Sequence, residues 1–338
     1  MANIAINGFG RIGRLFFRQA FGKKDLNIVA INDLGGIENL AYLLRYDSVY
    51  RRFGEKVEVK GDSLIVGGKE VRFLQEEDPL RLPWRDLGVQ VVVESTGAFD
   101  AYEKAKVHIH AGAKRVIISA PAKDEDGMEG KTVLMGVNDG ELNGMVLTSN
   151  GSCTTNAVSP LIAILSENPG ISKAILNTVH GYTATQALVD GPTRGKDMRR
   201  GRAAAQNIIP STTGAASAVA RAIPEFVGKF DGIAMRVPIL AGSIADITFI
   251  SKKKTSTDEI NDILRRAAKL KRWNGVFAVS DEPLVSSDII GEPYGAIADL
   301  SFTKVVDGNL VKVLSWYDNE WGYAATLVKH VEKVAALV

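Results

Sequence analysis

The feature that most constrains the fold is a glycine-rich turn near the start of the chain. Gly8, Gly10 and Gly13 form a G-x-G-x-x-G pattern directly after the strand-like residues 3–6. A helical pattern and a second strand-like run over residues 27–31 follow, so strand, turn, helix and strand make a βαβ unit. Such a unit predicts a parallel sheet with crossover helices.

The same turn predicts a dinucleotide site. The first glycine allows the tight turn, the second lets backbone approach a pyrophosphate, and the third lets helix and strand pack closely. The helix N-terminus offers N–H groups and a positive dipole end to phosphates. Asp33 follows Gly13 at about 20 residues, placed to bind ribose hydroxyls and repel a 2′-phosphate, which favours NAD over NADP. A tight turn without a ligand is the alternative.

The alternation of strands and helices continues through the first half. Strand-like runs at residues 89–94, 115–119 and 145–148 accompany a helical pattern over residues 101–111. Parallel sheets with helices on both faces are typical of this alternation. We therefore predict an α/β chain whose residues 1–152 form a Rossmann-type domain.

The second half has a different pattern. A helix is predicted from Cys153, an amphipathic helix over residues 257–269, and a final helix over residues 320–337. Strands grouped together predict an α+β domain over residues 153–318 with a mostly antiparallel sheet. The strand-like runs are residues 171–179, 233–237, 244–251, 300–302 and 310–316.

Composition excludes several classes of protein. The chain has 338 residues, 46% of them apolar, and a formal net charge of +2. This charge argues against a nucleic-acid or membrane-surface protein, and no apolar run reaches the ~18 residues of a membrane span. Cys153 is the single cysteine, which excludes an intrachain disulfide and indicates a reducing compartment. The start has no signal-peptide pattern, so we expect a cytoplasmic protein.

Cys153 is a candidate nucleophile. It lies at a predicted loop-to-helix junction, where the helix dipole favours the thiolate. A buried core cysteine is the alternative, but the neighbours are hydroxyls, an amide and glycine, which favours catalysis. His180 ends a strand-like run beside Gly181, and a Cys–His pair is the usual device for activating a thiol. A structural histidine is equally consistent with its local sequence.

The other three histidines carry weaker signals. His108 and His110 lie on a predicted helix with no further Cys or His ligand close in sequence, so we expect no metal there. His330 lies on the final predicted helix, where we expect it to face solvent.

Motifs along nearly the whole chain resemble those of the glyceraldehyde-3-phosphate dehydrogenase family. They include Ser-Cys-Thr-Thr-Asn at residues 152–156 and Thr-Val-His-Gly-Tyr-Thr-Ala-Thr-Gln at residues 178–186. Asn-Gly-Phe-Gly-Arg-Ile-Gly-Arg at residues 7–14 and Ser-Trp-Tyr-Asp-Asn-Glu at residues 315–320 also match, in the family's order. The resemblance implies a NAD-binding domain, a catalytic domain, and NAD-dependent oxidation of glyceraldehyde 3-phosphate with inorganic phosphate to 1,3-bisphosphoglycerate in glycolysis or gluconeogenesis.

The resemblance also implies a role for each matching residue. Cys153 attacks the aldehyde to give a thiohemiacetal and then a thioester, with His180 as the base. Substrate phosphate is assigned to Thr183, Arg199 and Arg236. Inorganic phosphate is assigned to Ser152, Thr154, Thr213 and Gly214. Cofactor contacts beyond the three glycines and Asp33 are assigned to Arg11, Ile12, Thr96, Ser119, Asn319 and Tyr323.

The resemblance further implies a homotetramer, in which the C-terminal helix of residues 319–338 packs back on the NAD-binding domain. Nucleic acid is not expected as the primary partner. The nearest alternative is erythrose-4-phosphate dehydrogenase, whose members usually alter the segments at residues 182–185 and 213–216, both intact here. The sequence also leaves open a relative with a secondary RNA-binding role and an aldehyde dehydrogenase that releases free acid.

Overall fold

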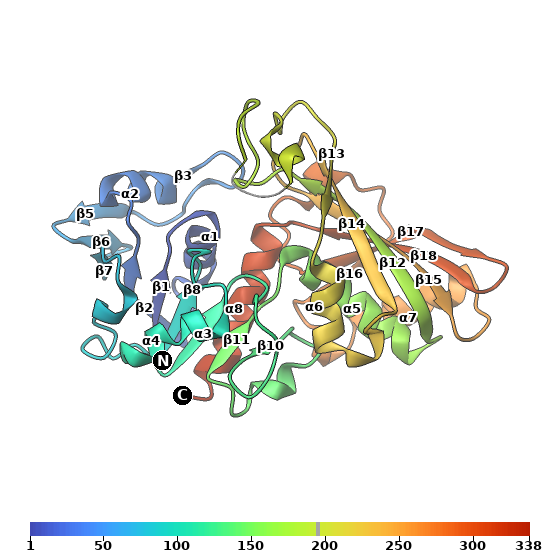
Figure 1. The fold of residues 1–338 in the computed structure, drawn as a ribbon, viewed down its shortest axis with the longest axis horizontal. Helices are drawn as coiled ribbons and strands as arrows, with labels where there is room; N and C mark the ends of the chain where they lie inside the picture. The colour runs from blue at the N-terminus through green and yellow to red at the C-terminus, as the bar shows by residue number, and fades with distance from the viewer. Residues whose placement is uncertain (194–196) are drawn as a thin grey trace. The chain divides into compact units, whose positions relative to one another are not determined.

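The computed structural model describes residues 1–193 and 197–338, which form two compact units (Figure 1). Each unit has its own sheet and its own core. The domain limits 1–152 and 153–318 remain predictions. Unit 1 comprises residues 1–134, 139–151 and 327–338, and unit 2 comprises residues 135–138 and 152–326.

Unit 1 contains a nine-stranded sheet in the order β10-β11-β9-β8-β1-β2-β7-β6-β5. Strands β10 to β7 pair in parallel, and β7, β6 and β5 pair antiparallel. The central strands are buried almost throughout, as expected when both faces of a parallel sheet are covered. The bounds are β1 (Ala2–Asn7), β2 (Leu26–Asn32), β5 (Val57–Lys60), β6 (Ser63–Val66), β7 (Lys69–Leu74), β8 (Val91–Glu94), β9 (Arg115–Ile118), β10 (Lys131–Thr132) and β11 (Leu147–Ser149).

The first helix of unit 1 begins directly after the glycine turn. Its residues Leu15, Phe16 and Phe17 are buried, and Phe17 packs edge-on against Phe9 of the turn. The predicted parallel sheet with crossover helices is therefore confirmed, although the predicted helix over residues 101–111 is divided into α3 and α4. The helices are α1 (Arg11–Ala20), α2 (Ile37–Arg45), α3 (Tyr102–Ala105), α4 (Val107–His110) and the end of α8 (Trp321–Ala335); β3 (Tyr46–Asp47) and β4 (Arg51–Arg52) form a small separate sheet.

Unit 2 contains a seven-stranded sheet in the order β13-β14-β12-β15-β18-β17-β16. It is mostly antiparallel, as predicted; only β12–β14 and β16–β17 pair in parallel. Buried and half-buried residues alternate along β15, so one face of the sheet is covered and the other is partly open to solvent. Helices α5, α6 and α7 pack against the sheet (Figure 1). The bounds are α5 (Cys153–Glu167), α6 (Ala215–Ala222), α7 (Thr257–Ala268), β12 (Ile171–Gly181), β13 (Ile209–Thr212), β14 (Phe230–Val237), β15 (Ser243–Ser251), β16 (Phe277–Ser280), β17 (Ala296–Val306) and β18 (Leu310–Tyr317).

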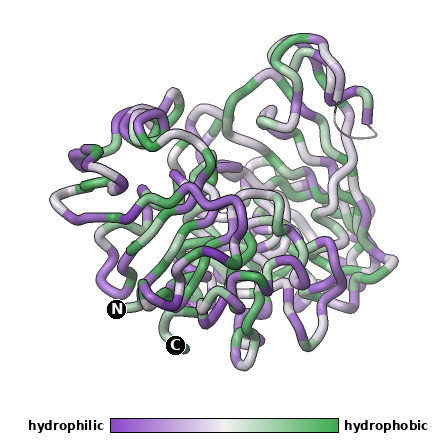
Figure 2. The backbone as a smooth tube through the Cα atoms, turned by 60° about the vertical axis from the view of Figure 1, so that its left-hand side comes forward, coloured by the Kyte–Doolittle hydropathy of each residue, from purple (hydrophilic) through white to green (hydrophobic). Residues whose placement is uncertain are grey.

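Hydrophobic residues are spread over many short segments of the chain (Figure 2). Among the helices of residues 1–193 and 197–338, none has both the length and the apolar character needed to cross a membrane.

His330 is fully buried in unit 1, so the expectation that it faces solvent was wrong. Its Nε2 lies 3.0 Å from Thr148 Oγ1, and its Nδ1 lies 3.1 Å from Asn150 Oδ1. These contacts join the end of α8 to β11 and the loop that follows it. Burial lowers the pKa of His330 to about 3, so the ring is neutral at neutral pH.

We predict that His330 makes the fold sensitive to acid. Its folded-state pKa of about 3 lies below the ordinary value of 6.5. The unfolded chain therefore binds an extra proton, and stability is lost as pH falls from 6.5 toward 3. From pH 7 to pH 5 this loss is about 2 kcal/mol. Denaturant unfolding should show His330→Gln losing less stability than wild type over that interval, and equal losses would contradict the prediction.

Candidate active site

Cys153 is the first residue of α5, and a capping box fixes its position. Ser152 Oγ accepts from the Thr155 N–H at 3.0 Å, and Thr155 Oγ1 accepts from the Ser152 N–H at 3.2 Å. This reciprocal pair satisfies two backbone donors at the helix start. Cys153 is partly exposed at the positive end of the helix dipole, unlike a core cysteine.

His180 lies near the end of β12 and is only 2% exposed. Its Nε2 is 3.3 Å from Cys153 Sγ, and its Nδ1 is 2.6 Å from the Gly181 carbonyl oxygen. Nδ1 thus faces both a carbonyl, which can only accept, and the Arg236 guanidinium, which can only donate, while Nε2 faces the thiol. Helix α5 and strand β12 thus bring the two predicted catalytic side chains together, oriented for transfer of the thiol proton to the imidazole.

Arg236 of β14 places a cation beside this pair. It contacts His180 Nδ1, and its Nη1 donates to the Gly181 carbonyl at 3.1 Å. Burial, reinforced by the Arg236 charge, lowers the pKa of His180 to about 3, so the imidazole is neutral and can accept a proton. Burial raises the pKa of Cys153, and Arg236 opposes that rise. The free chain therefore holds a thiol beside a neutral imidazole, rather than the thiolate expected from the helix dipole alone.

Tyr317 of β18 joins the two elements that carry the pair. Its hydroxyl lies 3.0 Å from Thr154 Oγ1 and 2.8 Å from Thr178 Oγ1, so one phenol connects α5 to β12. Its ring packs edge-on against His180. Burial raises the pKa of Tyr317, so the hydroxyl stays protonated. The sequence motif contained Tyr317, but gave no reason to assign it this role.

The structure distinguishes two neighbouring arginines. Arg199, predicted to hold substrate phosphate, is exposed and pairs with Asp197 at 2.9 Å. Arg200 instead donates to Ser211 Oγ at 3.2 Å, and its charge acts on Arg236. Arg199 therefore stays a prediction as a substrate-phosphate residue, and Arg200 is a neighbour whose side chain contacts β13.

The other predicted phosphate-binding residues lie in several elements of unit 2. Thr183 follows β12 and is half-buried. Gly214 is the exposed N-cap of α6, and Thr213 Oγ1 accepts from the Ala215 N–H in its first turn. The hydroxyl of Ser152 caps α5, and that of Thr154 contacts Tyr317.

The glycine turn of unit 1 has the shape that a dinucleotide requires. Gly8 has φ +93°, and a Cβ there would lie 2.5 Å from the Thr96 nitrogen. A Cβ at Gly13 would lie 2.1 Å from the Gly8 oxygen, so helix and strand need both glycines. A Cβ at Gly10 would meet no protein atom within 4 Å. The start of α1 is therefore open to a phosphate group at Gly10.

Asp33 supports the same turn. Its carboxylate accepts from the Phe9 N–H at 2.6 Å and from the Gly35 N–H at 2.8 Å. The predicted cofactor residue Arg11 forms an ion pair with Asp47. Ile12 and Ser119 are half-buried.

Glu94, which the sequence did not indicate as a site residue, holds the predicted cofactor residue Thr96 through hydrogen bonds. One carboxylate oxygen accepts from the Thr96 N–H at 2.8 Å, and the other accepts from Asn7 Nδ2 at 2.6 Å. His108 Nε2 lies 3.0 Å from the same carboxylate, and Trp84 Nε1 donates to His108 Nδ1 at 3.1 Å. His108 is thus a structural residue. Among the described residues, no group of three or more His, Cys, Asp or Glu could hold a metal ion.

Asn319 and Tyr323, the predicted nicotinamide contacts, are both buried in unit 2, with 5% and 4% exposure. Asn319 Oδ1 accepts from the Ser243 hydroxyl at 2.8 Å. Ser243 carried no signal in the sequence.

Comparison with known proteins finds relatives along the whole chain. The family model described as Glyceraldehyde 3-phosphate dehydrogenase, NAD binding domain, matches residues 2–102, and that described as Glyceraldehyde 3-phosphate dehydrogenase, C-terminal domain, matches residues 152–319. Glyceraldehyde-3-phosphate dehydrogenase of Thermotoga maritima is 51% identical over 335 residues, covering 98% of each chain. Proteins of the same name from Mycobacterium avium and Clostridium acetobutylicum are 48% and 46% identical, covering 98% and 97% of each chain.

We predict that Arg236 tunes both members of the Cys–His pair. Its cation favours the thiolate and opposes the imidazolium. In Arg236→Gln the pKa of Cys153 should therefore rise, and iodoacetamide should alkylate the thiol more slowly at neutral pH. The alkylation rate against pH measures this, with Arg265→Gln, a change at a half-buried arginine of α7, as the control. A midpoint that stays in place or moves to lower pH would be incompatible with this electrostatic role.

Proposed function

This chain belongs to the glyceraldehyde-3-phosphate dehydrogenase family, and on that premise we propose how its residues perform the reaction. The enzyme is a NAD-dependent oxidoreductase that converts glyceraldehyde 3-phosphate and phosphate to 1,3-bisphosphoglycerate, with formation of NADH. The observation that best supports the catalytic roles is the 3.3 Å distance between Cys153 Sγ and His180 Nε2.

Cys153 is the nucleophile and His180 the proton carrier. The sulfur bonds to the aldehyde carbon, while the thiol proton passes to His180 Nε2 and then to the substrate oxygen, giving a thiohemiacetal. His180 takes the hydroxyl proton as the carbon loses hydride and becomes a thioester. NAD, when bound, supplies the oxidant that accepts the hydride. The neutral ground state of the imidazole suits His180 to act as base in this step.

Inorganic phosphate then releases the product. A phosphate oxygen attacks the thioester carbon, the C–S bond breaks, and the Cys153 sulfur regains a proton from His180. The proton of the attacking phosphate is released to solvent, which completes the balance. The thiol and the neutral imidazole of the free chain are thereby restored.

Two sets of groups would hold the two phosphates. We assign the substrate phosphate to Arg236, Arg199 and Thr183, because a guanidinium fork matches phosphate oxygens. Arg236 supports this assignment by its position beside His180. The inorganic phosphate is assigned to Ser152, Thr154, Thr213 and Gly214.

The cofactor is NAD. We assign its pyrophosphate to the turn of Gly8, Gly10 and Gly13, supported by the open space at Gly10. Asp33 is assigned to the ribose hydroxyls. The remaining assigned contacts are those of Arg11, Ile12, Thr96, Ser119, Asn319 and Tyr323.

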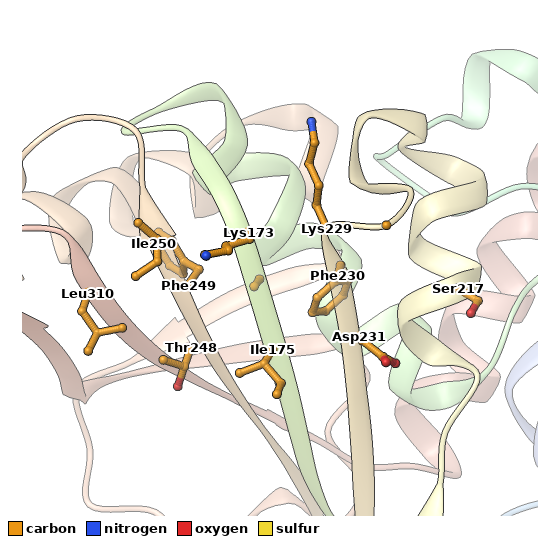
Figure 3. A pocket seen from close by; sticks show the side chains of 12 residues that line it. Lys173, Ile175, Ser217, Lys229, Phe230, Asp231, Thr248, Phe249, Ile250 and Leu310 are labelled. Carbon is orange, nitrogen blue, oxygen red and sulfur yellow. The ribbon is translucent and has the colours of Figure 1, made fainter.

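We also propose that the chain forms a homotetramer and works in the cytoplasm. The exposed face of the unit 2 sheet supports assembly: Ile175 and Leu310 are 62% and 40% exposed around an open hollow of about 640 Å³ (Figure 3). Lys173 and Asp231 on the same rim offer both signs of charge, as a self-complementary interface needs. The single cysteine, which must stay reduced to act, supports the location. Erythrose 4-phosphate as substrate and RNA as a secondary partner gain no support from the described residues.

Formation of NADH from glyceraldehyde 3-phosphate should require inorganic phosphate or arsenate. Absorbance at the NADH band, with and without the anion, measures this directly. Cys153→Ser should lower turnover at least about a thousandfold, because the nucleophile is lost, whereas Ser166→Ala on the same helix should not. Turnover that ignores phosphate would mean that water resolves the thioester, and would overturn the anion-site assignments.

A charge on the exposed sheet face should disrupt assembly. We predict that Ile175→Glu reduces the fraction of tetramer in sedimentation velocity, because burying an unpaired carboxylate is unfavourable. Met128→Glu, a change at a 96% exposed apolar residue of unit 1, is the matched control. If both variants sediment like wild type, this face is not the interface.

A further inference from the structure

The proposed function assigns Asn319 to the nicotinamide carboxamide. A side-chain amide can present either its oxygen or its nitrogen to such a ligand, because rotation by about 180° exchanges them. An amide free to rotate would therefore accept two orientations of the carboxamide. The enzyme needs a group that selects one of them.

Ser243 is placed to make that selection. It is the first residue of β15 and is 1% exposed. Its Oγ accepts from the Gly181 N–H at 3.1 Å and donates to Asn319 Oδ1 at 2.8 Å. Both contacts lie within unit 2: Gly181 and Ser243 are on the neighbouring strands β12 and β15, and Asn319 follows the end of β18.

The orientation of the Asn319 amide follows from the single proton that the Ser243 hydroxyl can donate. A serine hydroxyl has one proton, and the Gly181 N–H already occupies one of its lone pairs. Among residues 1–193 and 197–338, Asn319 Oδ1 is the only acceptor placed to receive that proton. The opposite rotamer of Asn319 would leave a buried hydroxyl without an acceptor, which is costly. Asn319 Nδ2 has no partner within the described chain, so it remains available to a ligand acceptor.

We propose that Ser243 is a positioning residue, which holds the Asn319 amide so that Nδ2 donates to the carbonyl oxygen of the nicotinamide carboxamide. This inference rests on the proposed function. Gly181 links the arrangement to the proposed proton carrier, since its carbonyl contacts His180 Nδ1 while its N–H donates to Ser243. One backbone residue thereby orders both side chains.

The proposal has a consequence for cofactor affinity. A carboxamide bound by a fixed donor is itself held in one rotation about the bond that joins it to the ring. If Asn319 can rotate, its oxygen can accept from the carboxamide NH₂ instead, and the carboxamide turns about its bond to the ring to match. Removing the Ser243 hydroxyl should therefore weaken NAD binding, because the Asn319 amide is no longer held in one rotamer before the cofactor binds.

The test compares Ser243→Ala with Ser243→Thr, which keeps the hydroxyl, and with Ser251→Ala. Ser251 is a buried serine at the far end of β15 whose hydroxyl contacts the Lys253 carbonyl. Titration calorimetry should show the NAD Kd of Ser243→Ala raised about tenfold, the effect of one hydrogen bond. Ser243→Thr should bind NAD closer to wild type than Ser243→Ala does, and Ser251→Ala should match wild type.

Two further variants distinguish failure of the Ser243 proposal from failure of the Asn319 assignment. They are Asn319→Ala and the double variant that carries both Ser243→Ala and Asn319→Ala. If Ser243 acts through Asn319, adding Ser243→Ala to Asn319→Ala should not weaken NAD binding further. An additional loss in the double variant, or a Ser243→Ala enzyme with unchanged Kd, would overturn the proposal. If Asn319→Ala itself leaves the Kd unchanged, the assignment of Asn319 to the cofactor fails instead, and with it the premise.

Discussion

The contact between His180 Nε2 and Cys153 Sγ is the interaction on which the proposed chemistry of unit 2 depends. The Gly181 carbonyl and the Arg236 guanidinium both contact Nδ1, and they hold the ring so that Nε2 faces the sulfur. Burial and the nearby Arg236 cation keep that ring neutral, which suits the proposed base. A rotated or protonated ring would not suit this proposed role, so the surrounding contacts matter because they hold the ring in one place.

Those contacts come from segments far apart in the sequence. The capping box fixes the start of α5, and Tyr317 connects that helix to β12 through two threonine hydroxyls. Unit 1 uses a comparable device, since the buried carboxylate of Glu94 organises Thr96 and Asn7 beside the glycine turn. In both units a buried polar group with satisfied partners supports a residue that is proposed to contact a ligand, so that residue is held in place by the chain itself.

The sequence predicted most of the fold because its signals were local. The glycine spacing, the apolar strands and the alternation in the second half identified both sheets. Short elements such as α2, α6 and the strands β5 to β7 were not predicted, since they offer too few residues for a period to show. The one clear error, His330, arose because a lone histidine on a helix does not reveal which face is buried. Arg199 and Arg200 are adjacent and chemically identical, so only the path of the loop separates them.

By itself, the sequence determined the class of fold and NAD as the cofactor, and it predicted Cys153 and His180 as the catalytic pair, because glycine geometry and thiol chemistry depend on residue type and short spacing. Only the tertiary structure decided which groups surround that pair and which side chain contacts Asn319. These depend on burial and on distances between β12, β14, β15 and β18. Proton positions follow from which donor meets which acceptor, and that is settled only when distant strands pair in register.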